Sequence, residues 1–73
     1  MRRTRKSVEL IHEGKYAAEV EIELTYGEES WSPTMSPHDA RKLDAVRLAL
    51  QRGDIAEAAK DGRVFELIPV AAE

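Results

Sequence analysis

Three glutamates, Glu19, Glu21 and Glu23, alternate with apolar residues in one segment and are the first candidates for chemistry. On a strand, alternate residues share one face at a spacing of about 6.8 Å, so the three carboxylates would form a row. Paired carboxylates can serve general acid-base catalysis or bind Mg²⁺. An exposed strand face must also be polar, and this simpler explanation favours a solvated row or a docking surface for a basic partner.

The two histidines, His12 and His38, give no metal-binding pattern. They are far apart in the sequence and the chain contains no Cys, so a transition-metal site would need both histidines together with acidic residues. The glycines are isolated, which excludes a glycine-rich phosphate loop, and no Ser-His-Asp arrangement is encoded locally. We therefore expect no catalytic residue, no metal and no cofactor, and predict that the chain is not an enzyme.

Length and composition predict one small domain. A chain of 73 residues buries only about 60% of the surface that its unfolded form exposes. The absence of Cys rules out a disulfide framework and suits a reducing compartment. No apolar run approaches the roughly 20 residues of a membrane span, and the basic start is not followed by the apolar core of a signal peptide. We expect a cytoplasmic protein without membrane contact.

The charge is distributed unevenly. The net charge is -3, yet the first six residues contain four cations: Arg2, Arg3, Arg5 and Lys6. We expect a flexible basic arm over residues 1-6, a single domain over 7-70 and a tail over 71-73. A basic arm on an acidic body could contact nucleic acid, whereas the simpler explanation is a solubilising end.

Apolar and polar residues alternate over residues 8-26, which predicts a half-buried β-hairpin. Its turn is expected at Glu13-Gly14-Lys15. A three-residue loop at this place would set Val8 opposite Val20 and would gather the apolar side chains of both strands, Leu10 included, on one face.

A helix is predicted from about Pro37 to Arg52, because apolar residues recur there at helical spacing. Ser36 is expected to cap its start, with Pro37 as the first helical residue. Gly53 suits the left-handed conformation that often ends a helix. A second, short helix is predicted over 54-62.

Two further extended segments complete the predicted fold. Residues 31-35 are expected to form a short third strand or an extended edge, because residues before Pro favour extended geometry. Residues 63-70 predict a final strand, which Pro69 places at an edge or ends. The order ββ(β)ααβ predicts an α+β fold: a small antiparallel sheet with one main helix and one short helix on one face.

Other residues are candidates for binding a partner. On a helical wheel, Leu48, Ala45, Arg41 and Arg52 lie roughly opposite the apolar stripe of the main helix. Either the short helix folds back over Leu48, or this surface is a dimer or partner site. Trp31 either packs in the core or is a hot spot for a partner.

Two segments, 13-EGKYAAEVEIEL-24 and 36-SPHDARKLDAVRLAL-50, resemble the N-terminal domain of HicB-type antitoxins, a partial RNase H-like module. They are similar to that family's turn into its second strand and to its helix start. The family's Pro-Gly-Cys-like step is absent here, and there is no space for its C-terminal DNA-binding domain, so the resemblance does not imply operator binding. Through residues 13-16, 31-33 and 42-44 the chain also resembles a group of small bacterial proteins.

Two functions follow as hypotheses. The first is a non-catalytic protein-interaction or regulatory, antitoxin-like module, which holds a protein such as a small basic partner through the glutamate row or the sheet edge near Trp31. A homodimer is also expected, because the core is small and Leu48 is exposed on an isolated helix. The alternative is a nucleic-acid-binding accessory protein that uses the basic arm together with Arg41 and Arg52.

Overall fold

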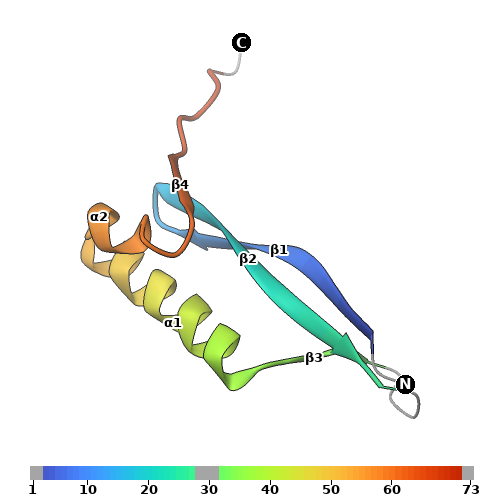
Figure 1. Cartoon of the computed structure of the whole chain (residues 1–73). Coiled ribbons are helices and arrows are strands. Elements are labelled where there is room, and N and C mark those ends of the chain that lie inside the picture. The colour runs from blue at the N-terminus through green and yellow to red at the C-terminus, as the bar shows by residue number, and fades with distance from the viewer. Residues whose placement is uncertain (1–2, 28–31, 72–73) are drawn as a thin grey trace.

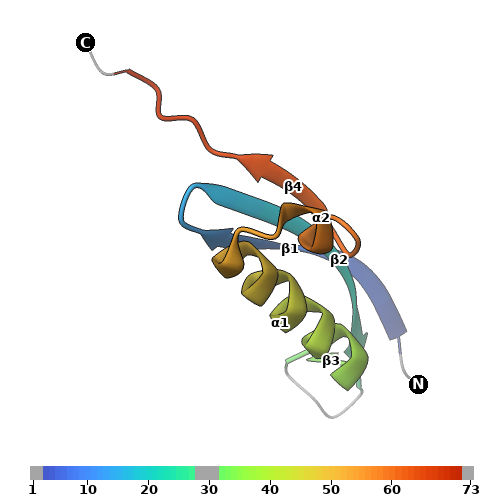
Figure 2. The ribbon, with the colours of Figure 1, turned by 90° about the vertical axis from the view of Figure 1, so that its left-hand side faces the viewer.

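Residues 3-27 and 32-71, which the computed structural model describes, form one antiparallel sheet with two helices on one of its faces (Figures 1 and 2). A long hairpin makes up most of the sheet, and its strands are β1 (Arg3–Glu13) and β2 (Tyr16–Tyr26). Two short strands pair with the other edge of β2, namely β3 (Thr34–Met35) and β4 (Arg63–Glu66). This arrangement confirms the α+β fold and the ββ(β)ααβ order.

The hairpin turn contains two residues, Gly14 and Lys15. Gly14 has a φ of 59°, a left-handed conformation that glycine adopts without a Cβ clash. A positive φ at the first loop position only is the pattern of a type II′ turn, whose twist matches that of the two strands. Glu13 therefore belongs to β1 rather than to the loop.

The hairpin register differs from the predicted one because of this shorter turn. Val8 lies opposite Glu21, not opposite Val20. Since side chains alternate between the two faces of a strand, a shift of one residue exchanges the faces. Ile11 consequently enters the core, while Val8 and Leu10 lie exposed on the other face of the sheet.

The main helix, α1 (Pro37–Arg52), has the predicted bounds and covers one face of the hairpin (Figure 2). The Ser36 side chain accepts a hydrogen bond from the backbone N–H of Asp39 at 3.1 Å, and Pro37 occupies the first turn. Gly53 ends the helix with a φ of 75°. The carboxylate of Asp39 also reaches the sheet, where it accepts the backbone N–H of Glu23.

The short helix, α2 (Ile55–Ala58), ends earlier than predicted, because residues 59-62 turn back toward the sheet. Asp54 caps its start by accepting the N–H of Glu57 at 3.2 Å. Gly62 then passes close to β2: a Cβ atom at this position would lie 2.8 Å from the carbonyl oxygen of Glu19. Only glycine therefore fits at the entry to β4.

The core lies between α1 and the sheet and consists, among the described residues, of eight aliphatic side chains. Its buried residues are Ile11, Ala18, Val20, Ile22, Val46, Ala49, Leu50 and Ala58. Its largest buried side chains are Leu50, Ile11 and Ile22, each 3% exposed, and none of the described aromatic residues is buried. The fold therefore withdraws little apolar surface from water.

Two predicted boundaries are wrong. Residues 3-6 do not belong to a flexible arm but to β1, where they pair with residues 23-26 of β2, because the long second strand offers them backbone partners. The final strand ends at Glu66, so residues 67-71 leave the sheet as an extended segment (Figure 1). Neither helix of the described residues is long and apolar enough to cross a membrane.

Candidate interaction surface

The helices cover only one face of the sheet, and the opposite face is open. Val64 packs against the core, so its neighbour Phe65 points to the open face, and the same alternation applies to β1 and β2. Four apolar residues of the three strands lie there, and we call them the open-face patch: Val8, Leu10, Ala17 and Phe65.

The open-face patch is continuous across the three strands. Ala17 lies opposite His12 of β1 and opposite Phe65 of β4, and these larger neighbours leave it only 5% exposed. Leu10 is the diagonal neighbour of Ala17 and is 66% exposed, and Val8 follows it on the same face at 59%. A row of aliphatic side chains on β1 thus continues over Ala17 to an aromatic ring on β4.

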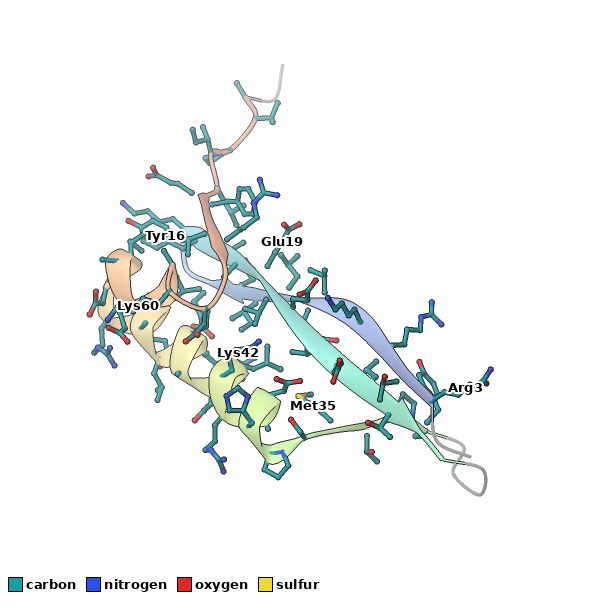
Figure 3. The ribbon with its side chains drawn as sticks, viewed as in Figure 1. Arg3, Tyr16, Glu19, Met35, Lys42 and Lys60 are labelled. Carbon is teal, nitrogen blue, oxygen red and sulfur yellow. The ribbon has the colours of Figure 1, made fainter. Side chains whose placement is uncertain are left out.

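The three glutamates share this open face, but their surroundings differ. Glu19 lies with its carboxylate 3.9 Å from the Arg63 guanidinium, and it points away from α1 (Figure 3). Glu23 is opposite Lys6 in the hairpin. Glu21 is opposite Val8 and forms no ion pair within the described residues. The row is therefore partly neutralised, and Glu21 is its one carboxylate without a basic residue directly opposite in the register of the three strands.

Arg63 links the charged and apolar parts of this surface. Its guanidinium carbon lies 5.3 Å from the centre of the Phe65 ring, within the range of a cation-π contact, while it faces Glu19 on the other side. No group of three His, Cys, Asp or Glu side chains in residues 3-27 and 32-71 is arranged to hold a metal ion. The surface can thus offer apolar contact and hydrogen-bond acceptors to a partner.

The candidate residues of α1 lie on a different side of the molecule. Leu48, Arg41 and Arg52 are exposed, and α2 does not cover Leu48, which keeps 46% of its surface accessible. Arg52 forms an ion pair with Asp54 at 3.8 Å. Because α1 covers the other face of the sheet, these residues do not join the glutamate row.

The basic residues Arg3 and Arg52 do not share one surface either. Arg3 pairs with Tyr26 at one end of the hairpin, whereas Arg52 lines a depression beside the hairpin turn at the other end. The eleven residues of β1 separate these ends by about 33 Å. Arg2 and Trp31 lie outside the described residues.

Sequence reasoning missed the open-face patch. It treated Val8 and Leu10 as core residues, although the adjacent Leu10-Ile11 pair allows either face of the strand to be buried. The only local signal is Gly14, which is compatible with the observed two-residue turn but also with the expected three-residue loop, so it does not select the register. Comparison with protein-family models, curated proteins and solved structures gave no match for this chain.

Proposed function

We propose that this chain is a non-catalytic protein-interaction module that binds a protein partner on the open face of its sheet. The carrying observation is the exposure of this face: Val8 and Leu10 of β1 and Phe65 of β4 keep 59%, 66% and 38% of their surface accessible on the side of the sheet that no described helix covers. Burying a side chain of the size of Leu or Phe contributes roughly 1.5-3 kcal/mol. Contiguous exposed apolar patches with a polar rim are characteristic of protein interaction sites.

The chemistry of the patch defines the partner that it suits. An aliphatic or aromatic side chain would contact Val8 and Leu10, and a Lys or Arg beside it would pair with Glu21, which has no ion pair in the described residues. A small basic protein with an apolar patch meets both conditions. The regulatory, antitoxin-like role that we propose for this contact rests on the sequence resemblance alone.

The proposal is tested by replacing one exposed leucine with lysine on the open face of the sheet and another on α1. Leu10→Lys places a charge in the open-face patch, and Leu48→Lys makes the same change on α1, where the leucine is also exposed. Tagged wild-type chain and both variants would capture proteins from the source organism, with folding checked by circular dichroism. We expect the captured partner to be retained by the wild type and by Leu48→Lys, and to be lost with Leu10→Lys.

The other outcomes contradict the proposal in different ways. Loss with Leu48→Lys alone would assign the contact to α1 and exclude the open face. If all three proteins capture the same partner equally, the open-face patch does not bind it. The same conclusion follows if the wild type captures no protein that Leu10→Lys fails to capture.

A further inference from the structure

The free edge of β1 is the longest unpaired backbone in the described part of the molecule. β1 pairs with β2 along all eleven residues, and no strand of the described residues pairs with its other edge. The N–H of Glu23 points away from β1, toward Asp39, so its opposite residue Lys6 also points away from β2. By alternation, the even-numbered residues from Thr4 to His12 direct their N–H and C=O groups to the free edge.

This edge lacks two of the devices that keep strands from pairing. β1 contains no proline, and its register with β2 runs without a bulge from end to end. An unpaired edge of this kind is a template for an added strand, because every second residue offers a donor and an acceptor. What the edge does carry is charge, and the order of the charges decides which strand it accepts.

On the face of β1 that is turned toward α1, the charged side chains are basic in the first half of the strand and acidic in the second half. Arg3 and Arg5 come first, and Glu9 and Glu13 follow after Ser7. A second copy of β1 in antiparallel orientation presents the same sequence in reverse, so its acidic half meets the basic half of the first copy, twice by symmetry. Opposite charges on directly facing or diagonal positions stabilise a strand pair.

One register fits better than its neighbours. A two-fold axis at Val8 pairs all eleven residues of each strand and sets Arg3 opposite Glu13 of the second copy. The Glu13 carboxylate also lies 3.5 Å from Arg47 of its own α1, so it would be shared between two cations. An axis at Glu9 would place two glutamates directly opposite each other, which is unfavourable. An axis at Ser7 would set Arg5 opposite Glu9, but it would pair only residues 3-11 and leave Glu13 beyond the first residue of β1 in the second copy.

We propose that a second copy of this chain pairs antiparallel along β1, with the two-fold axis at Val8. The two sheets then form one continuous sheet with both α1 helices on the same face. The two Val8 side chains lie side by side on the open face, each next to its own Leu10, so pairing joins the two open-face patches. This dimer does not rest on the partner proposed above, which could bind the chain in either state.

The test uses the absence of cysteine from the chain. In the proposed register the two Val8 Cα atoms lie about 5.5 Å apart, within the range that a disulfide spans. We therefore expect Val8→Cys to form a disulfide-linked dimer under mild oxidation on a non-reducing gel. Leu10→Cys would separate the two thiols by about 13 Å along the strands and should form no disulfide cross-link, and neither should the exposed control Leu48→Cys.

A second measurement needs no cross-link. Wild-type chain at high micromolar concentration should show by light scattering twice the 8.2 kDa mass of one chain. Val8→Pro removes an N–H that points to the free edge and not to β2, so we expect it to fold but to have the mass of a single chain.

Three results would each contradict a different part of the proposed dimer. A monomeric wild type over this concentration range contradicts the pairing itself. Cross-linking of Ser7→Cys instead of Val8→Cys contradicts the register, and equal cross-linking of Leu48→Cys contradicts the use of β1. None of these measurements involves the captured partner, so the two proposals fail separately.

Discussion

The carboxylate of Asp39 lies 2.9 Å from the backbone nitrogen of Glu23 and accepts its hydrogen bond. This contact joins the first turn of α1 to β2 in the interval between the residues that pair with β4 and those that pair with β3. It satisfies a strand N–H that has no strand partner there, and it fixes where the helix begins relative to the sheet. The Asp39 carboxylate thus takes the place of a strand partner for the Glu23 N–H, in the part of β2 that pairs with neither β3 nor β4.

The first prediction concerns acid stability. The hydrogen bond from Glu23 lowers the pKa of Asp39 below its ordinary value of 3.8, and His38 and Lys42 act in the same direction. A carboxyl with a lowered folded-state pKa stabilises the fold above its unfolded pKa, and this contribution is lost as the pH falls through the folded value. We therefore expect the stability due to Asp39 to decline below about pH 3.8.

Unfolding in urea at a series of pH values measures this effect. Asp39→Asn should show a weaker decline of the unfolding free energy in acid than the wild type. Asp44→Asn, on an exposed position of the same helix, serves as the control and should follow the wild type. Parallel curves for the wild type and Asp39→Asn would contradict the assigned role.

The second prediction concerns the helix cap. Ser36→Ala removes the oxygen that accepts the N–H of Asp39, and the loss of such a cap costs about 1 kcal/mol. Ser36→Thr keeps an acceptor oxygen, so its loss of unfolding free energy should be a few tenths of a kcal/mol at most. Thermal unfolding would compare the three proteins, and an unchanged midpoint for Ser36→Ala would refute the cap.

The third prediction concerns the close approach of the chain before β4. Gly62→Ala would place a methyl group 2.8 Å from the Glu19 carbonyl oxygen, so the turn must move away from β2. We expect a destabilisation of roughly 1-3 kcal/mol, as for overpacked sites. Asp61→Ala at the neighbouring exposed position is the control. Equal urea midpoints of the two variants would show that the turn adapts freely.

The fourth prediction compares two leucines of one helix. Leu50 is buried in the core, whereas Leu48 is exposed. Leu50→Ala should cost about 2-5 kcal/mol, a large part of the stability of so small a domain, and Leu48→Ala should change it by less than about 0.5 kcal/mol. A similar loss for both would mean that Leu48 is buried in solution, as in a dimer formed through α1.

Local signals in the sequence predicted most elements of this fold. The bounds of α1 follow from apolar spacing together with Ser36, Pro37 and Gly53, all of which act through neighbouring backbone groups. The hairpin follows from the alternation of apolar residues. These signals work because capping and alternation depend on residues a few positions apart.

Long-range contacts decided which face of β1 is buried. Leu10 and Ile11 are adjacent and both apolar, so alternation alone allows either one to face the helix. Ile11 packs against α1, and the Glu13 carboxylate on the same face lies 3.5 Å from Arg47 of that helix. The sequence by itself thus determined which elements form. Only the tertiary structure decided that Leu10 remains outside, because that choice depends on residues more than 30 positions away along the chain.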